Sequence, residues 1–87
     1  MFITNKVIET YFKGTKNIMS RTTILNNKIR DSHYYNRKGQ LTLMCSYKDN
    51  LRNGICMEWN HEGELLYIGI WNNDKPVNYF GDNRFYK

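Results

Sequence analysis

The sequence contains no alanine, only one proline and two cysteines, and no long uninterrupted apolar run. Alanine is the best helix former, and its absence beside plentiful Asn, Ile, Tyr, Thr and Phe favours strands and turns. The apolar stretches are too short for a signal peptide or a membrane-spanning helix. Cys45 and Cys56 match neither a disulfide-dense scaffold nor a paired CxxC site. We therefore expect an all-β protein with reduced thiols that stays in the cytoplasm.

What is present describes one small folded domain. The 87 residues are 40% hydrophobic and 15% aromatic, too apolar for a disordered chain. A domain of this size buries only about 60% of the surface that its unfolded chain exposes, so its core is thin. We predict a single domain over residues 1–87, with no second domain to build an enzyme cleft.

The net charge of +5 is unevenly distributed along the chain. Residues 1–52 carry ten basic and three acidic side chains, a net +7, whereas residues 53–87 carry a net −2. Such asymmetry is typical of proteins that contact an acidic partner, a nucleic acid or a further copy of themselves. The candidate basic contacts are Arg21, Arg30, Arg37, Lys38, Lys48 and Arg52.

The chain repeats itself at intervals of 23 to 24 residues. Residues 35–41 (YNRKGQL) align with residues 59–65 (WNHEGEL), and the turn at residues 47–51 aligns with those at 24–28 and 71–75. Such a period predicts a repeat architecture, here of about three units with two short strands each. The N-terminal unit is the most degraded.

Two kinds of turn recur in these units. The Asn-x-x-Gly segments at residues 36–39 and 60–63 are typical of hairpin turns closed by a glycine at positive φ. Asn27, Asn50 and Asp74 occupy equivalent positions of the other turn, and Asn and Asp tolerate the left-handed region best among non-glycine residues. We predict positive φ at all three, with Pro76 just beyond the last turn, where it interrupts no ladder.

The turns predict seven short strands near residues 7–12, 18–25, 32–36, 40–47, 54–60, 64–71 and 77–80. Together they predict an antiparallel β-meander of about three hairpin repeats in a single-layer sheet. The expected subdivision is an N-terminal strand or cover at residues 1–17, the repeats at 18–80 and a tail at 81–87.

This pattern resembles the MORN repeat, and most closely the divergent bacterial and viral form labelled as an antitoxin component. The matching residues are Tyr34, Tyr35, Asn36, Gly39, Leu41, Tyr47 and Gly54, and again Trp59, Asn60, Gly63, Leu65 and Trp71. The resemblance covers roughly residues 20–80. It implies a flat or gently twisted hairpin stack without catalytic residues, which binds proteins and sometimes membranes.

Strand alternation predicts one aromatic face and one mixed face. The aromatic face is expected to hold Tyr35, Leu41, Leu43, Cys45, Tyr47, Ile55, Met57, Trp59, Leu65, Tyr67 and Trp71. The mixed face keeps apolar residues that need a cover, either the N-terminal segment with Phe2, Ile3, Val7 and Ile8 or another chain. Its candidate protein interface is Met44, Leu66, Ile68 and Ile70.

The two cysteines test this assignment of faces. A symmetric hairpin would pair Cys45 with Cys56, whereas keeping all the aromatic residues on one face demands the other strand register. We follow the repeat pattern and expect the cysteines on opposite faces, without a disulfide.

Catalytic, metal and cofactor sites are not indicated. Asp31, Ser32 and His33 are triad residue types, but neighbours on a strand point to opposite faces. The carboxylates of Glu58, Glu62 and Glu64 are expected to be solvated, and the cysteines with His33 and His61 lack the short paired spacing of structural zinc. We expect no enzyme, no cofactor and no metal.

The leading hypothesis is a structural or adaptor protein that binds other proteins, including copies of itself. Codons rich in A and T encode its commonest residues, which suggests an AT-rich genome. Repeats that resemble these are abundant in AT-rich bacteria and large DNA viruses, so the resemblance implies a place in a large assembly such as the capsid of a large DNA virus. One alternative is a nucleic-acid binder that stacks bases on Tyr35, Trp59, Tyr67 and Trp71. The other is a bacterial antitoxin or immunity partner.

Overall fold

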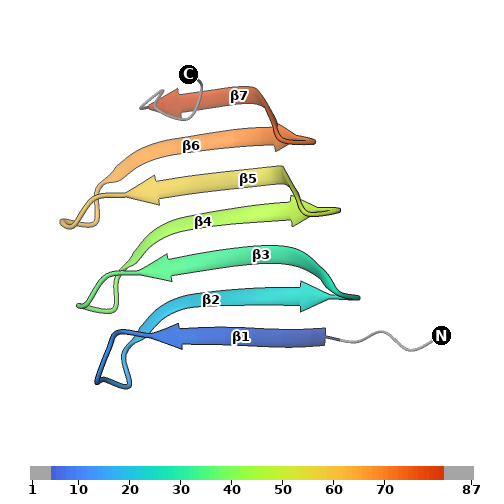
Figure 1. Ribbon diagram of the computed structural model, residues 1–87. Coiled ribbons are helices and arrows are strands. Elements are labelled where there is room, and N and C mark those ends of the chain that lie inside the picture. The colour runs from blue at the N-terminus through green and yellow to red at the C-terminus, as the bar shows by residue number, and fades with distance from the viewer. Residues whose placement is uncertain (1–4, 82–87) are drawn as a thin grey trace.

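The structure is one antiparallel sheet of seven strands in sequential order (Figure 1). The computed structural model describes residues 5–81, and of residues 79–81 the backbone alone. The strands are β1 (Asn5–Tyr11), β2 (Ile18–Leu25), β3 (Lys28–Tyr35), β4 (Leu41–Lys48), β5 (Leu51–Trp59), β6 (Leu65–Asn72) and β7 (Lys75–Gly81). The predicted all-β meander is confirmed.

The sheet is a slab of 38 × 36 × 16 Å, thin enough for a single layer. Within residues 5–81 no segment lies across either broad face, and no helix is long and apolar enough to cross a membrane. Val7 and Ile8 belong to β1, which lies in the sheet beside β2, and each is about half exposed. Phe2, Ile3 and residues 82–87 lie outside the described part of the chain.

The turns β2–β3, β4–β5 and β6–β7 lie at one end of the strands and have the predicted positive φ. Asn27, Asn50 and Asp74 have φ of 65°, 64° and 69°, and the residue before each also has a positive φ. Two consecutive left-handed residues make the tight two-residue turn that matches the twist of the strands. Strands β3, β5 and β7 consequently begin two to four residues earlier than predicted, and Pro76 lies inside β7, opposite Trp71.

These turns are also linked to one another across the sheet. The side-chain Oδ1 of Asn50 accepts a hydrogen bond from the backbone N of Ile29 at 3.0 Å. Asp74 accepts in the same way from Arg52, at 3.4 Å from its backbone N and 2.7 Å from its side-chain Nε. The side chains of Asn50 and Asp74 therefore join their turns to the preceding one.

Replacing Asn50 by alanine should destabilise the protein by about 1–2 kcal/mol, because alanine resists the left-handed region and cannot accept from Ile29. Asn50→Gly is the matched control, since glycine accepts this φ and loses only the hydrogen bond. Urea unfolding midpoints should rank wild type above Asn50→Gly and Asn50→Gly above Asn50→Ala. An alanine variant as stable as the glycine variant would contradict this role of the turn.

The hairpin turns at the other end confirm the sequence repeat in detail. Asn36 Oδ1 accepts from the backbone N atoms of Lys38 and Gln40 at 2.9 and 3.0 Å. Asn60 Oδ1 accepts from the backbone N atoms of the residues two and four positions later, at the same two distances. Gly39 and Gly63 close these turns with φ of 81° and 83°.

The register of the central hairpin corrects the predicted faces. Cys45 is the direct cross-strand partner of Cys56, so the two lie on the same face and the prediction of opposite faces is wrong. Ile55 and Met57, the neighbours of Cys56, then point away from the predicted aromatic face.

The physical reason is the size of one β-bulge. In β2–β3 and β6–β7 the register shifts by one residue beyond the turn, but in β4–β5 it shifts by two. A one-residue bulge changes which face the following residues occupy, whereas a two-residue irregularity leaves it unchanged. Gly54, at φ 99°, lies in this wider irregularity.

The buried side chains gather on one face, here called the core face. Its cluster consists of Cys45, Cys56, Tyr67 and Trp71, with Tyr47 packed against them. Tyr67 is only 1% exposed, and its hydroxyl accepts a hydrogen bond from the indole Nε1 of Trp71 at 2.9 Å. The Arg52 guanidinium lies 3.8 Å from the centre of the Trp71 ring. Large side chains from β4, β5 and β6 thus bury one another without a second layer.

Candidate protein-binding face

The face opposite the core carries a cluster of aliphatic and thioether side chains. Met44 of β4 lies opposite Met57 of β5, and Met57 lies opposite Ile68 of β6. Ile55 and Ile70 form the adjoining cross-strand pair on the same face. We call Met44, Ile55, Met57, Ile68 and Ile70 the methionine–isoleucine face.

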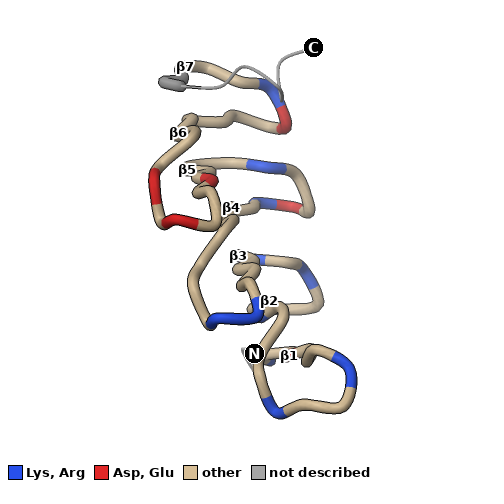
Figure 2. The backbone as a smooth tube through the Cα atoms, turned by 90° about the vertical axis from the view of Figure 1, so that its left-hand side faces the viewer, with Lys and Arg blue, Asp and Glu red and all other residues tan. Residues whose placement is uncertain are grey.

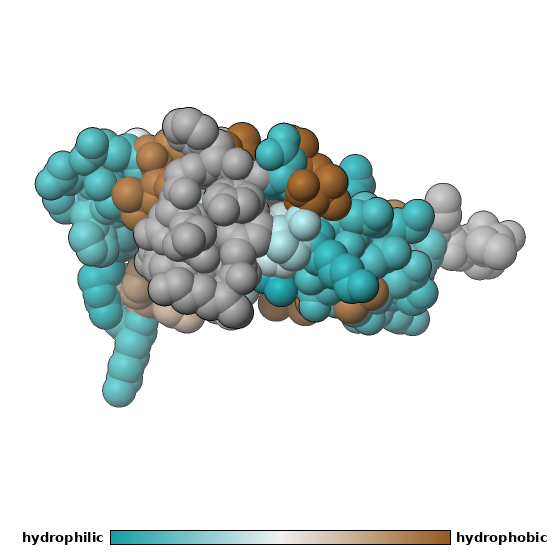
Figure 3. Space-filling view, turned by 90° about the horizontal axis from the view of Figure 1, so that it is seen from above, coloured by the Kyte–Doolittle hydropathy of each residue, from teal (hydrophilic) through white to brown (hydrophobic). Residues whose placement is uncertain are grey.

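This cluster is accessible and has a clear boundary. Ile55 and Ile70 are 45% and 48% exposed, and the other three members are partly buried. Towards β1–β3 the same side of the sheet becomes polar, with Arg21 Nε 3.7 Å from Glu9 and His33 Nδ1 3.6 Å from Asp31. In the view along the stack of strands, hydrophobic side chains reach the surface on both broad sides of the slab (Figure 3).

Three of the four predicted interface residues lie together on this face. Met44, Ile68 and Ile70 are members of it, and Leu66 lies two residues before Ile68 on β6, at the β5–β6 bulge. Sequence reasoning missed Ile55 and Met57, because it assigned them to the aromatic face. The symmetric pairing of Cys45 with Cys56 would have found both.

The longer turns β1–β2, β3–β4 and β5–β6 lie at one end of the strands and differ in the sign of their charge (Figure 2). The β1–β2 turn carries Lys13 and Lys16, and the β3–β4 turn carries Arg37 and Lys38. The β5–β6 turn carries Glu62 and Glu64 instead. The basic half of the sequence therefore places positive charge at the first two of these turns, and the acidic half places negative charge at the third.

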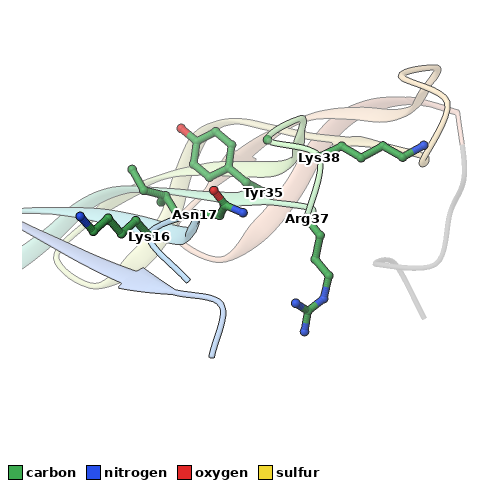
Figure 4. Close-up of a pocket in the computed structure, with 7 residues that line it drawn as sticks. Lys16, Asn17, Tyr35, Arg37 and Lys38 are labelled. Atoms are coloured by element: carbon green, nitrogen blue, oxygen red, sulfur yellow. The ribbon is translucent and has the colours of Figure 1, made fainter. Parts of the chain in front are cut away.

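A shallow hollow of about 440 Å³ lies between the two basic turns, lined in part by Lys16, Tyr35, Arg37 and Lys38. In Figure 4 the charged ends of the three basic side chains point away from one another. The Arg37 guanidinium lies 4.7 Å from the centre of the Phe12 ring. The hollow therefore has a basic rim, but its cations do not converge on one anion.

The six predicted basic contacts do not form one surface. Arg37 and Lys38 lie in the β3–β4 turn, whereas Lys48 adjoins the β4–β5 turn at the opposite end of the strands. Arg21 is on the methionine–isoleucine side beside Glu9, and Arg52 is on the core face, where its Nε is 2.7 Å from Asp74. Arg30 lies at the β2–β3 bulge.

The aromatic and catalytic candidates are likewise separated. Tyr67 and Trp71 are buried at 1% and 3% exposure, so neither can stack on a base, while Tyr35 and Trp59 are partly exposed. Ser32 is the cross-strand partner of Cys45, on the face opposite Asp31 and His33. The described residues contain no group of three or more His, Cys, Asp or Glu that could hold a metal, and His61 lies in a turn.

The contact between Arg52 and Asp74 makes a pH-dependent contribution to stability. The hydrogen bond from Arg52 lowers the pKa of Asp74 below its usual value. A carboxylate with a depressed folded-state pKa stabilises the fold above the unfolded-state pKa, and this contribution disappears as the pH falls through the folded-state value. Below about pH 4 the melting temperature of the wild type should therefore fall more steeply than that of Asp74→Asn. If the melting temperatures of the wild type and Asp74→Asn fall in parallel from pH 7 to pH 2, this contribution to stability is refuted.

The structure defines a single-layer antiparallel β-meander with a buried cluster on one face and a partly exposed apolar cluster on the other. No family model, no curated protein and no solved structure matches the chain.

Proposed function

We propose that the chain is a non-enzymatic, MORN-like structural or adaptor module that binds another protein through its methionine–isoleucine face. The partner's apolar surface packs on β4–β6, and the outer edge of β1 supplies further backbone contacts. A role as a small subunit of a large assembly, such as a viral capsid, agrees with this mode of binding.

The exposed pair of Ile55 and Ile70 carries the proposal. They are direct cross-strand partners, each nearly half exposed, and they adjoin Met44, Met57 and Ile68. Contiguous exposed apolar surface is typical of protein interfaces, and methionine is enriched there. The polar end of the same face, at β1–β3, would form the rim of the contact.

The outer edges of the described sheet differ in how well they accept another strand. Ile29 and Arg52, each the second residue of its strand, donate their backbone N–H to the next turn. Pro76 is the second residue of β7 and has no N–H to donate outward. Proline protects an edge in this way, so strand addition is expected at β1 and not at β7.

Nucleic-acid binding is the second candidate, supported by the basic turns β1–β2 and β3–β4 at the same end of the strands. Binding of this kind weakens steeply as salt rises, because phosphate contacts release counterions. Packing on the methionine–isoleucine face depends little on salt.

The test is affinity purification of the tagged protein from its native source, with and without nuclease and at two salt concentrations. Near-stoichiometric protein partners that survive nuclease and high salt would support the adaptor proposal. Loss of all partners on nuclease treatment would refute it in favour of nucleic-acid binding. A single partner encoded beside the chain and toxic alone would identify the antitoxin alternative.

A further inference from the structure

The two cysteines face each other in the middle of the core face. They are direct partners in the β4–β5 ladder, and both thiols are free. Partners on neighbouring antiparallel strands have Cα atoms about 4.5 to 5.5 Å apart, inside the 4.4–6.8 Å range of disulfides. A bond between them therefore needs no rearrangement of the strands.

A small hollow gives access to both cysteines. It has a volume of about 150 Å³ and is lined by Leu43, Cys45, Tyr47, Arg52, Cys56, Tyr67 and Trp71. The side chains themselves are mostly buried, at 9% exposure for Cys45 and 3% for Cys56. The hollow therefore admits a molecule of few atoms and excludes a peptide-sized reagent.

The two thiols lie beside a positively charged group. The charge of the Arg52 guanidinium acts to lower the pKa of both cysteines, against their burial, which acts to raise it. Arg52 is held in place by the Trp71 ring at 3.8 Å and by Asp74 at 2.7 Å. Cationic surroundings of this kind are typical of reactive cysteines.

We infer that Cys45 and Cys56 form a peroxide-reactive dithiol, in which one thiol attacks the peroxide and the other resolves the product. The thiolate of the first cysteine attacks one oxygen of hydrogen peroxide, the O–O bond breaks, hydroxide departs, and that cysteine becomes a sulfenic acid. The sulfur of the second cysteine then attacks the sulfenic sulfur, an S–S bond forms, and the proton of the second thiol leaves with the hydroxyl group as water. The two thiols are oxidised by two electrons, and the peroxide is reduced.

The product joins β4 to β5 beside the two-residue irregularity that contains Gly54. A cross-link there restricts the unfolded chain, so the oxidised protein should melt at a higher temperature than the reduced protein. Reduction by a dithiol reagent should reverse the shift. The redox state would then control the rigidity of the strands that also carry Met44, Ile55 and Met57.

The experiment exposes the reduced protein to hydrogen peroxide, alkylates the remaining thiols and measures the intact mass. The expected result is a protein lighter by two hydrogens, with no alkyl group added and full recovery on reduction. Cys45→Ser and Cys56→Ser should each accumulate a sulfenic acid on the remaining cysteine, which dimedone traps, because the resolving thiol is then missing.

Three outcomes would overturn the inference. In the first, both thiols of the wild type remain alkylatable after peroxide treatment. In the second, neither serine variant forms a dimedone adduct. In the third, small additions of urea speed the oxidation in proportion to the unfolded population. That result would mean that peroxide reaches the thiols only in the unfolded chain. Circular dichroism of both serine variants establishes that each is folded before its reaction with peroxide and dimedone is measured.

Discussion

Tyr67→Ala should abolish the cooperative thermal transition of the protein. Tyr67 is 1% exposed, the lowest value in the buried cluster, and it contacts the cluster from the middle of β6. Removing a buried aromatic ring costs about 3–5 kcal/mol, comparable to the whole stability of a small domain. A single-layer sheet has no second layer that could collapse into the space. Differential scanning calorimetry should show no transition for this variant.

Two control variants are needed. One distinguishes the effect of the Tyr67 ring from that of its hydroxyl, and the other measures the loss of an exposed tyrosine. Tyr67→Phe keeps the ring but leaves the buried Trp71 Nε1 without its acceptor, which should cost about 1–3 kcal/mol and lower the melting temperature. Tyr11→Ala removes a tyrosine that is 48% exposed and should melt close to wild type. If Tyr67→Ala melts like Tyr11→Ala, the core is elsewhere.

The combined variant Ile55→Lys and Ile70→Glu should lose protein association while it stays folded. The two residues are cross-strand partners and nearly half exposed, so the substitutions place opposite charges side by side in water. In a complex both charges would lie against an apolar partner surface and would have to be desolvated, at a cost of several kcal/mol. The recovery of partners in the affinity purification should fall at least about 100-fold, since each 1.4 kcal/mol is tenfold in affinity.

Val7→Lys is the matched control for this variant. Val7 lies on the same side of the sheet but in β1, outside the methionine–isoleucine face, and is 49% exposed. Its charge should leave both melting temperature and partner recovery unchanged. Undiminished recovery with the double variant would refute this face as the interface, and loss of folding would show that Ile55 and Ile70 belong to the core.

The sequence predicts the sheet well because local turn chemistry determines most of it. Asn27, Asn50 and Asp74 have the predicted positive φ, and Asn36 and Asn60 make matching hydrogen bonds in their turns. Two-residue turns and Asn-x-x-Gly hairpins allow few alternatives, so strand number and order follow from them. The exact starts of β3, β5 and β7 differ because the residue before each Asx also adopts a positive φ.

The assignment of faces depends on a feature that the repeat does not encode. Aligning the units at residues 47–51 and 71–75 implies equal bulges, yet the register shift is two residues in β4–β5 and one in β6–β7. One residue of bulge moves every later side chain to the opposite face. The position of Ile55 and Met57, two of the five residues of the methionine–isoleucine face, therefore depends on a single residue of register.

The most direct test is the register of the central hairpin, because the core face, the methionine–isoleucine face and the dithiol all follow from it. Cross-strand nuclear Overhauser effects in isotopically labelled protein measure it. We predict backbone contacts between Cys45 and Cys56 and between Met44 and Met57. Contacts of Cys45 with Met57 instead would place the cysteines on opposite faces and contradict the assignment of both surfaces.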